Sequence, residues 1–258
     1  YNMNYKAMNI LNILSLFLSL SCNSVPQKDS GSKPVSHQIW DQLLKKHVSN
    51  NGKVNYKGFI KDSTKLNQYI ELISSHYPND QYWSREQQMA YWINAYNAFT
   101  VQLIIRHYPV KSIKDIGSKF QVTFINTVWD IKFINIEGAK MDLNNIEHSI
   151  LRKKFRDPRI HFAINCASNS CPQLRNEAFD PEKLDKQLDE QAIAFINDPS
   201  KNIIRADGIN ISKIFSWFKG DFTRNSSLID FLNKYSKVKI NAKVRIVFGE
   251  YDWELNEG

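Results

Sequence analysis

The sequence predicts a mixed α and β (α+β) fold in which residues 36–258 form a single domain, with a mainly antiparallel central sheet packed against a long, aromatic-rich helix. Three observations favour this class. Apolar residues recur at helical spacing in several segments, short alternating segments bounded by turn residues lie between them, and no internal repeat or linker follows Pro34. Helices and strands that intermix along one uninterrupted stretch are explained most simply by one domain.

The composition is that of a folded, basic protein. Of the 258 residues 42% are hydrophobic, and fifteen Phe, eleven Tyr and six Trp supply enough apolar surface for a substantial core. The formal net charge is +8, but the positive residues are scattered among 26 acidic ones. The densest basic run, residues 152–156 with Arg159 beyond it, lacks a stacking platform or a known nucleic-acid motif. We therefore predict a solvated helix face there and no nucleic-acid partner.

The beginning of the chain is typical of a bacterial lipoprotein precursor. Met3 or Met8 is the expected initiator, and the apolar run 10–20 is too short to cross a bilayer as a stable helix. Ser21 directly before Cys22 resembles a lipoprotein-processing site, where the thiol receives a diacylglycerol group and becomes the new N-terminus.

This pattern predicts a protein that leaves the cytoplasm. We expect residues 1–21 to be a signal peptide, and residues 22–35 to comprise the lipidated Cys22 and a flexible tether rich in Ser, Pro and Lys. The membrane is then a partner through the lipid anchor, with the domain in the periplasm or on the cell surface. The alternative is an ordinary secretory signal beside a coincidental cysteine.

Three helices are expected in the first half of the domain. The first begins at Ser36 as its N-cap, and the second spans residues 64–77. The third begins after Ser84, which forms a capping-box pattern with Gln87, and ends before Pro109. The residues of the third helix that recur at helical spacing are Met89, Trp92, Ile93, Tyr96, Thr100, Leu103 and Ile104.

Strands and helices alternate in the rest of the chain. In chain order, the sequence predicts β structure over 120–141 with a turn at Glu137-Gly138, a helix over 143–155 capped by Asp142, a strand over 160–166, a helix from Asp180-Pro181, a hairpin turn at Asp207-Gly208, helices over 214–218 and 228–235, and a strand over 244–248.

The segment HFAINCASNSCP (161–172) is the strongest candidate for chemistry. The predicted strand leads into a loop of small polar residues that ends at Cys171, before Pro172. Such a loop can present a nucleophilic thiol while backbone N–H groups gather around an oxyanion. A thiolate needs a nearby cation or base, and His161 and His148 are the imidazoles of this region.

Two other interpretations of the cysteines stay open. Cys166 and Cys171 have four residues between them and could form a disulfide in an oxidising compartment, or they could be inert buried thiols. Zinc is not expected, because the spacing lacks a second pair of ligands. We expect neither a metal nor another cofactor.

Glu147 is a carboxylate inside an apolar helix stripe. A lone buried charge is costly, so Glu147 is either an acid or base with a raised pKa or the partner of an arginine in a structural ion pair. The adjacent His148 faces another direction, nearer Arg152, and is either a base or a surface residue. The stripe consists of Leu143, Ile146, Ile150 and Leu151.

Three asparagines are candidates for binding or for fixing a loop. Asn94 and Asn97 lie three residues apart in the third helix, although Asn is a mediocre helix former. Their amides could bind a substrate backbone or lock a neighbouring loop, and locking is the commoner use. Asn165, beside Cys166, is placed in the same group.

Long segments of the chain resemble the family known as domain of unknown function 547. They are GKVNYKGF (52–59), WSREQQMAYWINAYNAFT (83–100), HYPVKSIKDI (107–116), LNNIEHSILRKKFRDPRIHFAINCASNSCPQL (143–174), ISKIFSWFKGDF (211–222) and YDWELN (251–256). The resemblance implies a globular domain that is often exported in bacteria, and it supplies no reaction, substrate or cofactor. The candidate residues from Asn94 to Cys171 lie inside these segments.

Two functions are consistent with these patterns. In the first, the protein is a thiol-dependent hydrolase or acyltransferase of peptide-like envelope material, in which Cys171 attacks, His161 is the base and Glu147 orients the imidazole or stabilises its charged form. In the second, it is a non-catalytic binding module, stapled by a disulfide between Cys166 and Cys171, that presents a groove to an envelope ligand.

Overall fold

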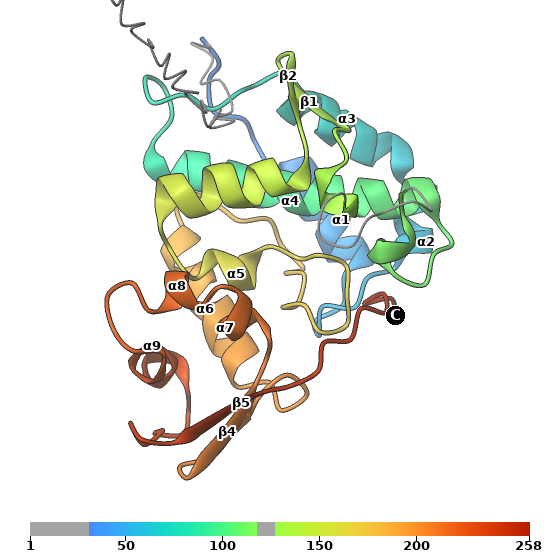
Figure 1. The fold of residues 1–258 in the computed structure, drawn as a ribbon. Coiled ribbons are helices and arrows are strands. Elements are labelled where there is room, and N and C mark those ends of the chain that lie inside the picture. The colour runs from blue at the N-terminus through green and yellow to red at the C-terminus, as the bar shows by residue number, and fades with distance from the viewer. Residues whose placement is uncertain (1–30, 118–126) are drawn as a thin grey trace, which may run out of the picture.

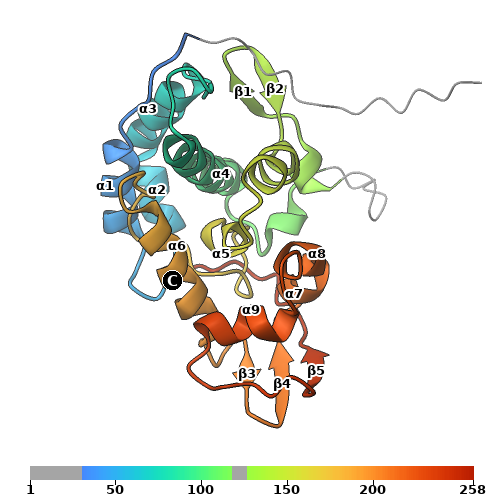
Figure 2. The same cartoon turned by 90° about the vertical axis from the view of Figure 1, so that its left-hand side faces the viewer.

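The computed structural model describes residues 31–117 and 127–258, which are mixed helix and strand, as predicted (Figure 1). The predicted signal peptide, Cys22 and the first part of the tether lie outside the described residues. The longest helix, α4 (Arg85–His107), lies in the middle of the larger half of the structure (Figure 2). Helices α2 (Tyr56–Lys61), α3 (Ser63–Ser74) and η3 (Asn145–Phe155) contact α4, and α1 (Gln38–His47) packs on α2 and α3.

Helix α4 begins as predicted and is buried on all sides. Ser84 Oγ accepts the N–H of Gln87, and the Gln87 side chain accepts the N–H of Ser84, which completes the capping box. Every residue from Gln88 to Ile104 is buried. Other elements must therefore pack around the whole circumference of α4. No helix in the described ranges is long and apolar enough to span a membrane.

Several other predicted elements are confirmed. The helix predicted over 64–77 corresponds to α3. The turn predicted at Glu137-Gly138 joins β1 (Ile134–Ile136) to β2 (Ala139–Met141). The first part of the β structure predicted over 120–141, up to residue 126, lies outside the described ranges. The remaining predicted elements are α6 (Leu184–Ile196), β3 (Ile203–Ile204), β4 (Gly208–Ile211), α7 (Ile214–Trp217), α9 (Leu228–Tyr235) and β5 (Arg245–Phe248). The sequence did not predict α2, α8 (Lys219–Phe222), η1 (Ile113–Asp115) or η2 (Val128–Asp130).

The predicted central antiparallel sheet is not confirmed. Within the described residues, the strands form a two-stranded sheet of β1 and β2 and a three-stranded sheet of β3, β4 and β5. In the second sheet β3 and β4 are antiparallel, whereas β4 and β5 are parallel. These strands are two to four residues long, so each offers little apolar surface, and helices supply most of the covering of α4.

The predicted strand over 160–166 is wrong. Residues Ile160–Ala163 form the single-turn helix α5, and extended chain follows from Ile164. All residues from 160 to 165 are buried, so the alternation of apolar and polar residues did not distinguish an inner face from an outer one.

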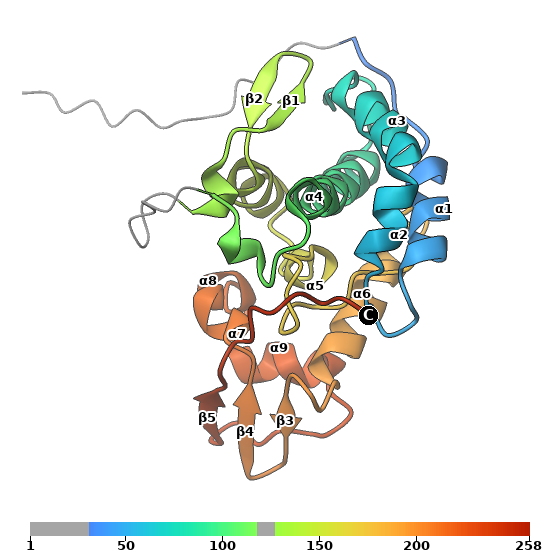
Figure 3. The ribbon, with the colours of Figure 1, turned by 90° about the vertical axis from the view of Figure 1, so that its right-hand side faces the viewer.

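The buried side chains form two apolar clusters that meet at α5. Ile160 and Ala163 belong to the larger cluster around α4, whereas Phe162 belongs to the smaller cluster formed with α6, α7 and α9. The end of the chain, residues 251–257, runs between the two halves (Figure 3). It pairs with Val54, Ser112 and Ser168 through isolated bridges.

Asn94 fixes the segment before α6 to the central helix. Its Nδ2 donates to the carbonyl of Phe179 at 2.8 Å, and its Oδ1 accepts the N–H of Phe179 at 2.9 Å. Asn94 is 1% exposed, so water cannot replace either bond.

We predict that Asn94→Ala lowers the free energy of unfolding by about 3 kcal/mol, because two buried backbone groups lose their partners. Gln68→Ala, which removes an exposed amide inside α3, is the control and should change it by less than about 0.5 kcal/mol. Urea denaturation measures both, and equal losses in the two variants would contradict the role given to Asn94.

Candidate functional site

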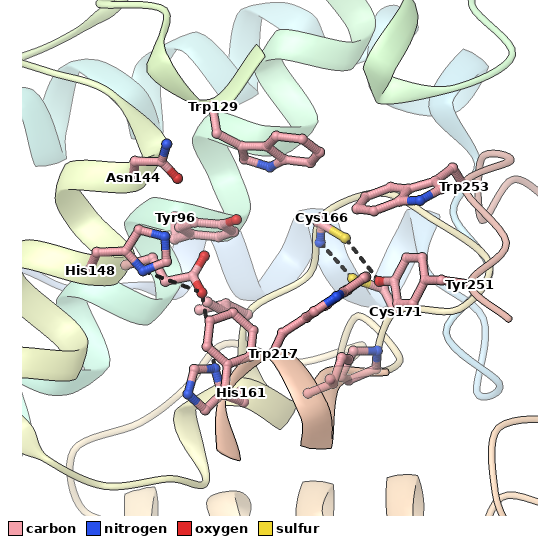
Figure 4. A pocket seen from close by; sticks show the side chains of 15 residues that line it. Tyr96, Trp129, Asn144, His148, His161, Cys166, Cys171, Trp217, Tyr251 and Trp253 are labelled. Carbon is pink, nitrogen blue, oxygen red and sulfur yellow. Dashed lines mark hydrogen bonds and ion pairs between the residues drawn. The ribbon is translucent and has the colours of Figure 1, made fainter. Parts of the chain in front are cut away.

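A cavity of about 200 Å³ lies at the boundary between the two apolar clusters (Figure 4). Glu147 and His148 reach it from η3, His161 from α5, and Cys166 and Cys171 from the loop that follows α5. Figure 4 shows the cysteines at one side of the cavity and the two histidines at the other. The aromatic lining consists of Tyr96, Trp129, Trp217, Phe218, Tyr251 and Trp253.

The helix that carries Glu147 and His148 is wound as a π-helix over Asn145–Phe155. Asp142 accepts the N–H of Asn145 at 2.6 Å, as the predicted cap requires. The π winding is rare and is frequently found at functional sites. It adds an independent reason to regard this cavity as the candidate site.

Asparagine amides hold the loop that carries the two cysteines. Asn97 donates to the carbonyl of Ala163 at 2.9 Å and accepts the N–H of Asn165 at 2.8 Å. Asn165 in turn donates to the carbonyl of Pro172 at 2.7 Å and accepts the N–H of Ala167 at 2.8 Å. Ala167 has a φ of 61°, a left-handed conformation that is unfavourable for a residue with a Cβ. These amides therefore lock a strained loop in place.

Cys171 is a buried thiol that receives a backbone hydrogen bond. The N–H of Cys166 donates to Cys171 Sγ at 2.9 Å, and neither cysteine is in a disulfide in this structure. Burial by itself would raise the pKa of Cys171, but hydrogen bonds from Cys166 and Tyr251 outweigh it and lower this pKa below its usual value. The pKa of Cys166 is raised, because its hydrogen bond to Cys171 and its burial both favour the neutral thiol. Of the two, Cys171 is the better nucleophile.

Asp221, on α8, orients the imidazole of His161. His161 Nε2 lies 2.8 Å from Asp221 Oδ2, and the ring stacks on Phe218 with centroids 3.9 Å apart. Burial lowers the pKa of His161, although the hydrogen bond to Asp221 acts in the opposite direction. A neutral His161 therefore donates Nε2–H to Asp221 and keeps a lone pair on Nδ1.

Arg152, which is half-buried, extends this network to His148. Its Nε donates to Asp221 Oδ2 at 2.6 Å, and its NH1 donates to His148 Nδ1 at 3.1 Å. Hydrogen bonding to His161, then to Arg152, holds the pKa of Asp221 well below its usual range. The prediction of a solvated basic face is wrong for Arg152, which binds Asp221 of α8, and for Arg159, which contacts Asp157 in its own loop and Asp185 and Asp189 of α6.

Glu147 is buried and has no arginine partner within salt-bridge distance among the described residues. Its Oε1 lies 4.0 Å from His161 Nδ1 and 3.9 Å from His148 Nδ1. Burial raises the pKa of Glu147 to about 7, against the influence of Arg152. Of the two interpretations left open by the sequence, this geometry favours an acid or base with a raised pKa.

His148 lies at the edge of the cavity, with its side chain 41% exposed. Burial of the rest of the ring, then the charge of Arg152, lowers its pKa to about 4. Because Nδ1 accepts from Arg152, a neutral His148 carries its proton on Nε2.

The structure brings the predicted chemical residues to one cavity but arranges them differently. Within residues 31–117 and 127–258, no hydrogen bond joins Cys171 to His161, and Asp221 occupies the orienting position that was predicted for Glu147. Asp221 was missed, although it is the only acidic residue in the aromatic segment 211–222. The same ranges contain no group of three or more His, Cys, Asp or Glu side chains placed to hold a metal ion.

Residues 81–196 match the model of a family described as Protein of unknown function, DUF547. The match covers a little less than half of the chain and includes α4, η3, α5 and the cysteine loop. It supports assigning this part of the chain to the family that the sequence segments resemble. Asp221 and Tyr251 lie beyond the matched residues. Comparisons with curated proteins and with solved structures gave no match.

The raised pKa of Glu147 predicts a pH-dependent stability. The folded state holds this proton more tightly than the unfolded chain, whose pKa is near 4.5, so the stability is complete below pH 4.5 and is lost as the pH rises through about 7. From pH 4.5 to 8, wild type should lose about 3 kcal/mol relative to Glu147→Gln, which cannot ionise.

Urea denaturation at several pH values measures this difference. Glu71→Gln, which removes an exposed carboxylate on α3, is the control and should follow wild type at every pH. Parallel curves for wild type and Glu147→Gln would show that the folded and unfolded chains bind this proton equally well.

Proposed function

We propose that this chain is an exported, lipid-anchored envelope protein and a thiol-dependent hydrolase or acyltransferase of peptide-like substrates. The observation that carries the catalytic part is the shared cavity of Cys171 and His161. The Cys171 thiol accepts a hydrogen bond from the Cys166 N–H. Asp221 binds Nε2 of the His161 imidazole, which leaves a lone pair free on Nδ1. Nucleophile, base and orienting acid are the three parts that thiol catalysis of acyl transfer requires.

The reaction would proceed in two balanced stages. The Cys171 thiol gives its proton to His161, and the thiolate forms a C–S bond to the substrate carbonyl carbon while the C=O electron pair moves to oxygen. The intermediate then collapses, the bond to the leaving amine breaks, and the imidazolium protonates that amine to leave a thioester. In the second stage, water in a hydrolase or an acceptor amine in a transferase gives a proton to His161 as it attacks the thioester carbonyl carbon. The C–S bond then breaks to release the acid or the new amide, and the imidazolium protonates the departing thiolate.

The surrounding residues support these steps in distinct ways. Asp221 stabilises the imidazolium and fixes which ring nitrogen carries the proton. No hydrogen bond joins Cys171 to His161 in the described ranges, so the proposal requires a water that relays the first proton between them. The aromatic walls exclude bulk water from the reacting atoms.

The second candidate is a non-catalytic binding module. The observation that favours it is the group of aromatic rings beside the cavity, where Trp253 contacts Trp129, Trp217 and Tyr251 with centroids 4.5 to 5.9 Å apart. Aromatic side chains of this kind are common in ligand sites. A binding module would need neither a free thiol nor an oriented imidazole.

We predict that Cys171 is a free thiol that reacts with iodoacetamide at pH 7 faster than free cysteine does. Cys166→Ala should slow this reaction, because its thiol hydrogen bond helps to lower the pKa of Cys171. Intact mass and peptide mapping identify the alkylated residue. Absence of alkylation until a reductant is added would show a disulfide and favour the binding module.

Catalysis is tested with 4-nitrophenyl acetate, which should acetylate Cys171 in a burst that intact-mass measurement detects. His161→Gln, whose amide can still donate to Asp221, should reduce kcat/KM by roughly 10²-fold or more. Cys171→Ala gives the background rate. A rate that does not change in either variant would eliminate this mechanism.

The anchor rests on the sequence pattern around Cys22, which lies outside the described residues. Full-length protein expressed in a bacterial host should fractionate with the membrane, and Cys22→Ala should be recovered in the soluble exported fraction. Ser24→Ala is the control and should remain with the membrane. Retention of Cys22→Ala by the membrane would indicate an uncleaved apolar segment instead of a lipid.

A further inference from the structure

A second cavity, of about 450 Å³, lies on the other side of Cys171. Cys171 and Pro172 line both this cavity and the aromatic one, so the thiol sits between two spaces of different chemistry. The lining of the second cavity is mainly polar and includes Lys53, Asn169 and Lys201.

We propose that this polar cavity is the subsite for a carboxylate on the acyl half of the substrate. The inference rests on the proposed thiol function, because it assigns one side of the scissile bond to each cavity. It names the substrate class as an amide or ester whose acyl group carries an acid, as in an acidic peptide.

Two lysine side chains converge on one asparagine in this cavity. Lys53 Nζ donates to Asn169 Oδ1 at 2.9 Å, and Lys201 Nζ donates to the backbone carbonyl of Asn169. Among the described residues, no carboxylate lies within salt-bridge distance of either ammonium group. Asp198, the acid in the lining, accepts instead from the N–H and hydroxyl of Ser200. Two positive charges with only neutral partners attract an anion.

The residue on which the lysines meet is held rigidly. The N–H of Asn169 donates to the carbonyl of Glu254 at 2.7 Å, and its Nδ2 donates to Asp252 Oδ2 at 3.0 Å. The ammonium groups are therefore positioned by the closing segment of the chain, and the buried side chains of Asn165 and Ser168 form part of the same lining. This arrangement is that of a preformed polar site next to the nucleophile.

His161 decides which half of the substrate enters each cavity. It lines the aromatic cavity and is absent from the polar one. The leaving group takes its proton from His161, so it departs through the aromatic cavity. The acyl group that remains on Cys171 Sγ then extends into the polar cavity, toward Lys53 and Lys201.

The test compares 4-nitrophenyl hydrogen glutarate with 4-nitrophenyl valerate, which matches it in chain length and lacks the acid. Wild type should prefer the glutarate ester by roughly tenfold or more in kcat/KM, since a charge-assisted contact is worth at least this much. Lys53→Met/Lys201→Met should remove the preference, mainly through a higher KM for the glutarate ester. Lys57→Met, an exposed lysine on α2, is the control and should keep the preference.

Binding of glutarate itself separates this inference from the catalytic proposal. Calorimetry should detect glutarate binding to wild type and to Cys171→Ala, and should detect none in the double lysine variant. Binding without turnover of either ester would sustain the subsite and overturn the thiol enzyme. Turnover of both esters at equal rates, without glutarate binding, would overturn the subsite and leave the enzyme standing. Circular dichroism checks that each variant is folded, and Lys201→Met alone replaces the double variant if that one unfolds.

Discussion

The carboxamide of Asn97 fixes the position of the candidate site. Asn97 lies within the fully buried part of α4, and its two hydrogen bonds hold the backbone at Ala163 and Asn165. His161 precedes this held stretch by two residues, and Cys166 follows it directly. Because the Asn97 amide is 2% exposed, water cannot replace either hydrogen bond. Displacing the loop would therefore leave buried polar groups of Asn97 and of the loop backbone without partners. Helix α4 therefore fixes the positions of both the His161 imidazole and the cysteine thiols.

A second constraint joins the two apolar clusters across the cavity. Asp221 comes from α8, on the side of the smaller cluster, and it bonds both His161 of α5 and Arg152 of η3. Removing Asp221 would leave the ring N–H of His161, which is 3% exposed, without its acceptor. The network thus holds the two sides of the cavity together and gives His161 its orientation at the same time. The orientation of His161 and the contact between the two sides of the cavity depend on the same carboxylate.

Local signals in the sequence were sufficient where an element is defined by its own residues. The capping box at Ser84, the turn at Glu137-Gly138 and the amphipathic run 228–235 each predicted an element that the structure contains. The strand over 160–166 failed because this stretch is buried on every side, so periodicity carried no information. The central sheet is not confirmed, because short alternating segments indicate single strands, whereas the pairing of strands depends on tertiary contacts.

The candidate site shows the same division between local and distant information. Burial of Glu147 could be predicted, because its neighbours in the helix stripe are apolar. Its lack of an arginine partner could not, because Arg152 is drawn instead to Asp221, 69 residues further along the chain. The role of Asp221 depends on a contact with His161 over 60 residues, which no spacing within one element reveals.

Two acidic groups, the Cys171 thiol and the Glu147 carboxyl, line the aromatic cavity, and the negative charge of one disfavours ionisation of the other. Cys171 raises the pKa of Glu147 through its negative charge, after the larger effect of burial, and both groups line one mainly apolar space. Ionising the thiol therefore makes the carboxyl harder to ionise. In the proposed mechanism the thiolate is consumed in a thioester, so this repulsion would end there and the carboxyl would lose its proton more readily. A pH profile of the proposed first stage would therefore include the effect of the thiolate on Glu147, whereas a profile of the proposed second stage would report Glu147 and His161 without the thiolate.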